Sequence, residues 1–268
     1  MSVGKSIFTA ESLSSAYGRE EILREVSFSL EAGQLTALLG LNGCGKTTLM
    51  KCIAQRLSHD GCCKLKGEGL ETLNTRQLAQ RLSYIPQRSG VRISLPVLDV
   101  VLMGFNSQLS LLARPSKTQV NRAVKALESV GMQDYADRDY QTLSEGQKQL
   151  VILARLLVEE SSLLLLDEPD SALDFQNRYG MLWNLRKLCE EKQNSALLCL
   201  HDPHLALEFC SQLILLKDGR VHEVLHPEQD SLSKMEKALQ DIYGSISLME
   251  QLDAKGKRRL ILLWEGRI

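Results

Sequence analysis

The sequence lacks the marks of several classes of protein. Only 5% of its 268 residues are aromatic, and 32 Lys and Arg residues balance 33 Asp and Glu residues to a formal net charge of -1. Proteins that hold nucleic acid through its phosphates are usually more basic, so this balance disfavours a nucleic-acid partner. A hydrophobic content of 44% disfavours disorder. We therefore expect one globular core with an inserted or appended piece.

Disulfide, metal-cluster and membrane signals are also missing. The seven cysteines are odd in number and Cys62 is adjacent to Cys63, which favours free thiols in a reducing compartment. Without a CxxC pair, a zinc or iron–sulfur site has no ligand set. Apolar runs such as Leu213–Leu216 are too short to span a membrane, and Met1–Ala10 lacks the apolar region of a signal peptide.

Short apolar segments bounded by turn residues predict strands, and helical patterns lie between them. The predicted strands are Ser6–Phe8, Val26–Leu30, Gln34–Leu39, Cys62–Leu65, Leu82–Ile85, Ser162–Leu166, Ala196–Leu200 and Leu213–Leu216. Strands that alternate with helices predict an α/β fold with a mostly parallel sheet covered on both faces.

Two regions depart from this alternation. Residues 88–158 show helical periodicity and no convincing strand, which predicts a helical insertion with a Ser116-x-x-Gln119 capping box and a buried helix over Leu150–Val158. The tail, residues 231–268, predicts a helix and then a β-hairpin formed by Ile246–Met249 and Leu260–Trp264. A lipid or nucleic-acid contact could be indicated by the four basic residues near its turn, Lys255, Lys257, Arg258 and Arg259. Four charges are few, which favours a solvated hairpin tip instead.

The strongest motif is a glycine-rich segment that follows the predicted strand Gln34–Leu39 and precedes a helical stretch. It matches G-x-x-x-x-G-K-[ST] with Gly40, Leu41, Asn42, Gly43, Cys44, Gly45, Lys46, Thr47 and Thr48. Glycines let successive N–H groups converge on phosphate oxygens at a helix N-terminus. Lys46 would supply a charge to the β- and γ-phosphates, and the Thr47 hydroxyl would bind Mg²⁺. The alternative, a chance glycine-rich turn, is disfavoured by the strand and helix on either side.

Carboxylates follow a second apolar strand. A buried parallel strand over Leu163–Leu166 would deliver Asp167 and Glu168 to the sheet edge beside the phosphate loop. Asp167 could then hold Mg²⁺ and Glu168 could polarise an attacking water; the alternative is a surface acidic pair. His201 ends another strand near the expected γ-phosphate position. A metal site at His201 and His204 is disfavoured because no third protein ligand is suitably placed.

The chain resembles the ATP-binding cassette (ABC) ATPase family. Leu143-Ser144-Glu145-Gly146-Gln147 looks like the family's signature and lies shortly before the acidic strand. The resemblance implies an ABC ATPase fold: a P-loop NTPase core with a mostly parallel sheet, an N-terminal antiparallel β part and the helical subdomain inserted at about 88–158. It places the ATPase domain at residues 1–230 and a C-terminal extension at 231–268.

The resemblance also assigns roles to single residues. It implies that Tyr17 stacks on adenine, that Gln87 contacts Mg²⁺ and the attacking water and couples to the membrane partner, and that His201 is the switch histidine. Ser144, Gly146 and Gln147 would contact the γ-phosphate held by a second copy, and Ser144-x-x-Gln147 is itself a helix capping pattern. The loop Ser171–Asp174 would cross to the opposite subunit.

Three residues depart from the family pattern. Glu145 replaces the commonest glycine, Asp170 replaces a Thr or Ser, and Cys44 occupies a variable place in the phosphate loop. The first two bear on nucleotide affinity and turnover. Cys44 could make the site sensitive to thiol reagents or could simply be a small packed residue.

The resemblance implies a homodimer that sandwiches two ATP molecules, bound to integral membrane permease subunits and acting indirectly with a substrate-binding protein. The chain would then lie peripherally on the cytoplasmic face of the inner membrane. Leu95–Phe105 with Gln108–Arg114 is similar to importers of iron–siderophore complexes, haem and cobalamin, although an ordinary amphipathic helix would also fit. Two alternatives stay open: a soluble ABC ATPase in cofactor assembly, and a regulatory module that binds ATP but barely hydrolyses it.

Overall fold

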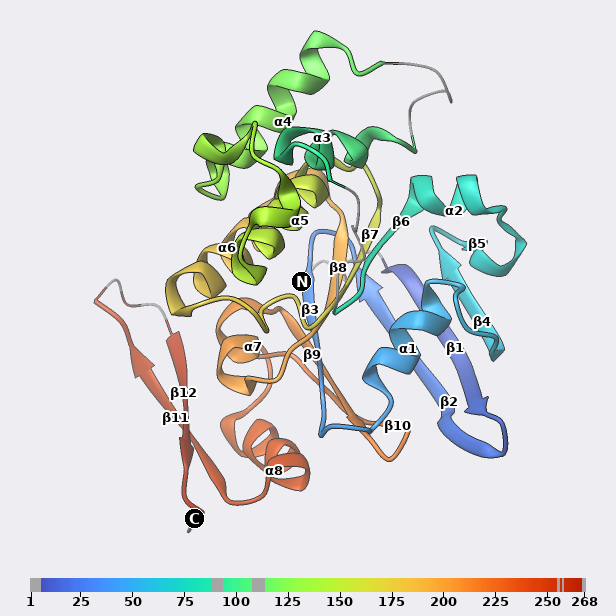
Figure 1. The fold of residues 1–268 in the computed structure, drawn as a ribbon. Helices are drawn as coiled ribbons and strands as arrows, with labels where there is room; N and C mark the ends of the chain where they lie inside the picture. Colours follow the sequence, from blue (N-terminus) through green and yellow to red (C-terminus); the bar gives the residue numbers. More distant parts are fainter. Residues whose placement is uncertain (1–5, 88–93, 108–113, 255, 257, 267–268) are drawn as a thin grey trace.

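The computed structural model describes residues 6–87, 94–107, 114–254, 256 and 258–266 (Figure 1). The strands are β1 (Ser6–Tyr17), β2 (Glu20–Glu31), β3 (Leu35–Leu39), β4 (Asp60–Leu65), β5 (Glu68–Gly69), β6 (Leu82–Ile85), β7 (Leu163–Asp167), β8 (Ser195–Cys199), β9 (Gln212–Lys217), β10 (Arg220–Leu225), β11 (Ile246–Leu252) and β12 (Arg258–Trp264). The α-helices are α1 (Lys46–Ile53), α2 (Thr75–Arg81), α3 (Val97–Leu102), α4 (Lys117–Ser129), α5 (Glu145–Val158), α6 (Phe175–Lys192), α7 (Pro203–Phe209) and α8 (Leu232–Tyr243).

A six-stranded sheet forms the centre, with the strand order β10-β9-β3-β8-β7-β6. All neighbours are parallel except β10, which pairs with β9 in the antiparallel sense. Both faces of the sheet are covered, as the apolar strands predict. In β7, Leu163 and Leu165 join the core that contains α1, whereas Leu164 and Leu166 join the core on the opposite face. Because successive side chains of a strand point to opposite faces, the side chain of the next residue, Asp167, lies on the α1 side.

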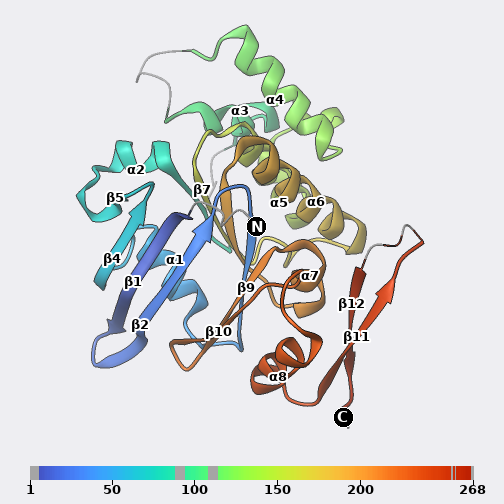
Figure 2. The same cartoon turned by 180° about the vertical axis from the view of Figure 1, so that it is seen from behind.

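A second, antiparallel sheet has the order β2-β1-β4-β5 and shares its core with α1. In both views it lies on the side of the molecule away from the β11–β12 hairpin (Figures 1 and 2). This sheet is the N-terminal antiparallel part that the resemblance implies. Its first two strands are far longer than the predicted segments, because polar residues such as Glu11 and Ser14 alternate with buried ones.

Helices α3, α4 and α5 gather at one end of the molecule (Figures 1 and 2). Within the described parts of 88–158 the backbone forms no strand, and only an isolated bridge joins Pro96 to Asp139. The predicted capping box is present, since Ser116 accepts a hydrogen bond from the N–H of Gln119 and the Gln119 side chain accepts one from Ser116. Of the importer-like segment Gln108–Arg114, residues 108–113 lie outside the described residues.

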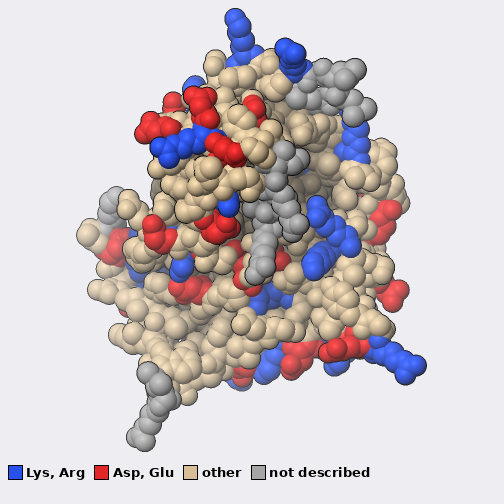
Figure 3. Space-filling model, in the orientation of Figure 1, with Lys and Arg blue, Asp and Glu red and all other residues tan. Residues whose placement is uncertain are grey.

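The tail forms the predicted helix, α8, and the predicted hairpin, in which Ile246 pairs with Trp264 and Leu252 with Arg258. Arg259 holds the hairpin to α7 through an ion pair with Glu208 at 2.7 Å. Lys255 and Lys257 lie outside the described residues. On the face shown in Figure 3, basic and acidic side chains are interspersed with broad uncharged areas. Across the residues the structure describes, every helix is too short or too polar to span a bilayer.

Candidate nucleotide-binding site

The phosphate loop joins β3 to α1, as its sequence predicts. Gly45 is the N-cap of α1 and has a φ of 108°, a left-handed conformation that favours glycine. Gly40 lies so close to β9 that an added Cβ would come 2.3 Å from the carbonyl oxygen of Leu216. The loop and its neighbours enclose a cavity of about 200 Å³. The lining residues are Ile22, Asn42, Gly43, Gly45, Lys46, Thr47, Thr48 and Glu168.

The Lys46 side chain is folded back onto this loop. Its Nζ donates hydrogen bonds to the carbonyl oxygens of Gly40 at 2.7 Å and Leu41 at 3.1 Å, and the residue is only 6% exposed. A buried ammonium group is therefore held at the cavity wall by neutral acceptors. Phosphate oxygens are stronger partners for it, because hydrogen bonds between ionised groups are stronger than those with neutral groups.

Thr47 and Asp167 meet between α1 and β7. The Thr47 hydroxyl lies 3.2 Å from Oδ1 of Asp167 and donates a hydrogen bond to it, and Asp167 is 1% exposed. A buried carboxylate beside a hydroxyl is a set of hard oxygen donors, which is the ligand type that Mg²⁺ prefers. These two residues therefore fit the predicted Mg²⁺ site.

The three predicted catalytic residues come together on Glu168. Its Oε1 lies 2.6 Å from Nε2 of His201, and its Oε2 accepts a hydrogen bond from Nε2 of Gln87. The residues follow β6, β7 and β8, which are neighbouring parallel strands whose carboxyl ends share one edge of the sheet. Glu168 has a φ of 51°, an uncommon conformation for a residue with a side chain. The arrangement places a carboxylate, oriented from both sides, on the cavity wall.

The signature residues cap α5. Ser144 Oγ accepts a hydrogen bond from the N–H of Gln147, and the Gln147 side chain accepts one from the N–H of Ser144. Gly146 lies against Ala172, whose carbonyl oxygen would be 2.9 Å from an added Cβ. Among the described residues, neither Ser144 nor Gly146 nor Gln147 lines the phosphate-loop cavity. Tyr17, at the end of β1, is also absent from the lining and is 48% exposed.

The departures from the family pattern have different surroundings. Glu145 projects outward and forms an ion pair with Lys148 at 2.9 Å. Asp170 is buried, with Oδ2 3.5 Å from Nε of Arg178 on α6. Burial raises the pKa of Asp170, and the nearby Arg178 charge opposes that rise. Burial likewise raises the pKa of the Cys44 thiol, against the charge of Lys46.

Two neighbours of the site were not predicted. Arg178 pairs with Asp170 from a different element, and no spacing rule links them. Cys199 ends β8 opposite Asp167, and burial, with the Asp167 carboxylate as a second cause, raises the pKa of its thiol. A protonated, fully buried thiol is a poor nucleophile. Sequence patterns give no signal for either residue, since both depend on packing.

The family model for ABC transporters matches residues 23–171, which include the phosphate loop, the signature and the acidic strand. The chain belongs to the ABC transporter family. The recognition from sequence is thus confirmed, and the chain is an ATP-binding, ATP-hydrolysing member of that family.

Curated relatives and solved structures agree with this assignment. This chain is 34% identical to the iron(3+)-hydroxamate import ATP-binding protein of Bacillus subtilis over 80% of each chain. It is 36% identical to the hemin import ATP-binding protein of Rhizobium etli over 75% of this chain and 78% of the relative. A dimeric ATP-binding cassette bound to ADP and phosphate superposes with a TM-score of 0.73 at 24% identity, over 82% of this chain and 98% of the other. That likeness confirms the predicted ABC ATPase fold.

Proposed function

We propose that this chain binds Mg-ATP at the phosphate loop and hydrolyses it to power import of an iron chelate. The supporting observation is the convergence of Gln87 and His201 on Glu168, at the cavity that Lys46 and Thr47 line. Such a carboxylate beside a phosphate-binding loop is positioned for water activation.

The chain's own residues divide the chemistry between them. Lys46 exchanges its carbonyl partners for the β- and γ-phosphates. Glu168 accepts a hydrogen bond from the attacking water and takes its proton as the water oxygen bonds to the γ-phosphorus. The bond between the γ-phosphorus and the β,γ-bridging oxygen breaks in the same displacement, and ADP leaves with that oxygen. His201 and Gln87 fix the direction of the Glu168 carboxylate. Thr47, Asp167 and Gln87 would hold Mg²⁺, which when bound neutralises phosphate charge.

A second copy of the chain would complete the site. Ser144, Gly146 and Gln147 do not line their own chain's cavity, and they stand at the N-terminus of α5, where phosphate binds favourably. They would therefore cover the nucleotide held by the partner copy. Tyr17 would stack on adenine, as the family resemblance implies. The solved cassette that superposes on this chain is itself dimeric, which supports pairing with a second copy.

The relatives support a proposal for the cargo and for the membrane partners. Two of them are import ATP-binding proteins for iron hydroxamate and for hemin. The proposed cargo is accordingly an iron complex such as a siderophore or haem. The proposed partners are integral membrane permease subunits and, indirectly, a substrate-binding protein. The chain would lie on the cytoplasmic face of the membrane, with residues 1–230 as ATPase domain and 231–268 as an extension.

One experiment tests import directly. The tagged chain is purified from detergent-solubilised membranes, its partners are identified, and uptake of radiolabelled iron chelates is compared in cells with and without the gene. Co-purification of a polytopic membrane protein and loss of chelate uptake are expected. If the chain purifies without a membrane protein and chelate uptake is unchanged in cells that lack the gene, the cofactor-assembly alternative is favoured.

A further inference from the structure

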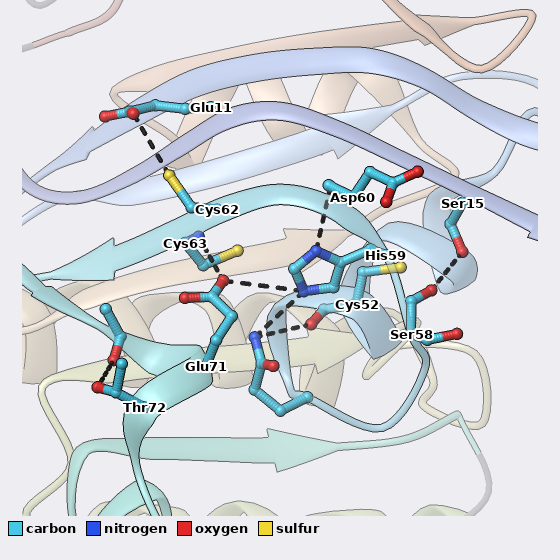
Figure 4. A network of polar contacts seen from close by, with 12 residues as sticks. Glu11, Ser15, Cys52, Ser58, His59, Asp60, Cys62, Cys63, Glu71 and Thr72 are labelled. Atoms are coloured by element: carbon cyan, nitrogen blue, oxygen red, sulfur yellow. Dashed lines mark hydrogen bonds and ion pairs between the residues drawn. The ribbon is translucent and has the colours of Figure 1, made fainter.

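A second group of metal-ligating side chains lies outside the lining of the phosphate-loop cavity and on different elements (Figure 4). His59 precedes β4, Cys63 lies within β4, and Glu71 lies in the short 3-10 turn Leu70–Thr72 that follows β5. One ligand atom of each residue falls within 4.8 Å of the others. Nitrogen, sulfur and carboxylate oxygen together are the donor set of zinc sites.

The histidine is held in the orientation that metal binding needs. Its side chain is only 3% exposed, and its Nδ1 lies 3.2 Å from the carbonyl oxygen of Asp60. A carbonyl oxygen can only accept a hydrogen bond, so Nδ1 carries the proton and its N–H donates a hydrogen bond to the carbonyl oxygen of Asp60. The lone pair then resides on Nε2, which accepts a hydrogen bond from Nε2 of Gln55 at 3.3 Å and lies 3.9 Å from Oε1 of Glu71. A bound metal would take the place of the Gln55 contact. A backbone carbonyl that fixes the tautomer in this way is a common outer-shell partner of metal-bound histidine.

The other two ligands are also held in place. Cys63 is fully buried in β4. Its backbone N–H donates a hydrogen bond to Oε1 of Glu71 at 2.6 Å, which draws the carboxylate over the strand. The Glu71 side chain is 34% exposed, so an ion can reach the cluster from its side. Figure 4 shows the carboxylate lying between the Cys63 backbone and the imidazole.

We propose that His59, Cys63 and Glu71 bind a zinc-class divalent cation, with water as the fourth ligand. Zinc bond lengths of about 2.0–2.3 Å set tetrahedral ligand separations of roughly 3.4–3.6 Å. The present separations, up to 4.8 Å, therefore need to close by about 1 Å. Glu71 is the most exposed of the three side chains and so has the most freedom to move, although its hydrogen bond from the Cys63 N–H would have to lengthen. The Cys63 thiol releases its proton to solvent when the metal binds.

The neighbouring cysteine provides a matched control. Successive side chains of a strand point to opposite faces, and the Cys62 thiol donates to Oε2 of Glu11 at 3.4 Å, away from the cluster (Figure 4). A spacing rule based on CxxC pairs does not detect this set, because its three ligands come from three different local structures.

The test uses the full-length chain, stripped with chelator and titrated with Co²⁺ and Zn²⁺. A thiolate-to-cobalt charge-transfer band at one metal per chain is expected, with displacement by Zn²⁺. Cys63→Ala should abolish the band, and Cys62→Ala should retain it. His59→Gln and Glu71→Gln, which keep the residues polar, should each weaken binding by at least the roughly 10- to 100-fold that outer-shell changes cause.

The following results would overturn the metal-site proposal. A band that survives in Cys63→Ala, or equal Zn²⁺ affinity in all four variants, places the cation elsewhere and overturns the proposal. Absence of any thiolate band in the folded wild-type chain also overturns it. If Cys63→Ala proves unstable by circular dichroism, the Glu71→Gln titration decides, because Glu71 is partly exposed.

Discussion

Nε2 of His201 lies 2.6 Å from Oε1 of Glu168, although the two residues follow different strands of the central sheet. The opposite oxygen of the same carboxylate is held by Gln87. A glutamate side chain has several rotatable bonds, so contacts on both oxygens restrict it to one direction. The site is thus organised around the Glu168 carboxylate before nucleotide contacts are considered.

The first prediction concerns this carboxylate. Glu168→Gln preserves the size and hydrogen-bonding capacity of the side chain but removes its ability to accept the water's proton. We expect hydrolysis to fall by at least about 10²-fold. ATP binding should persist, because Lys46 and the loop amides are untouched. Phosphate release and fluorescent-nucleotide binding measure the two quantities.

Glu160→Gln is the control for that change, because Glu160 is an exposed residue paired with Arg122 outside the site. It should hydrolyse ATP at the wild-type rate. Near-normal turnover in Glu168→Gln would remove Glu168 from its assigned role.

Lys46→Ala is expected to weaken ATP binding on the order of 10- to 100-fold, the range for losing charge-assisted hydrogen bonds. The loop would also lose the two bonds that Lys46 makes to Gly40 and Leu41. Equilibrium nucleotide titration checks the affinity. Lys51→Ala, on the same helix, should bind ATP normally; equal affinity in both variants would contradict the phosphate-loop assignment.

Whether a site residue can be predicted from the sequence depends on how far apart in the chain the cooperating residues lie. The phosphate loop and the acidic strand are local patterns, so the residues themselves predict them. The gathering of Gln87 and His201 on Glu168 was expected only through family resemblance, because strand order decides which ends are neighbours. Packing pairs such as Asp170 with Arg178 had no local signal at all.

The secondary structure shows the same division. Buried β6 was located residue for residue, since both of its faces are covered. β10 was missed because only Leu225 of its six residues is buried. Helix α2 was missed because it has no buried residue, and its stability depends on the Asn74–Gln77 capping box. Exposed elements carry little hydrophobic pattern to detect.

A prediction on stability uses two glycines. Gly40→Ala would drive a Cβ to within 2.3 Å of the Leu216 carbonyl and 2.7 Å of the Cys44 sulfur, so the loop has to shift. We expect a loss of about 1–3 kcal/mol in the free energy of unfolding, measured with urea.

Gly180→Ala is the control: Gly180 lies exposed in α6, and an added Cβ meets no atom within 4 Å. It should gain about 0.5–1 kcal/mol. Equal stability of the two variants would contradict the close approach at Gly40.

The last prediction concerns the pH dependence caused by Asp170. Burial raises the pKa of this carboxyl in the folded chain above its ordinary value of 3.8, with the Arg178 charge opposing the rise. An acid with a raised folded-state pKa binds protons more tightly when folded, so its stabilising contribution is present below the unfolded pKa. That contribution is lost as pH rises through the folded-state pKa.

Asp170→Asn does not titrate and so escapes this loss. The stability of Asp170→Asn relative to wild type should therefore increase between pH 4 and pH 7, as measured by urea unfolding. Asp134→Asn, at an exposed position, supplies the baseline. A relative stability of Asp170→Asn that falls over this interval would show that the ion pair with Arg178 outweighs burial.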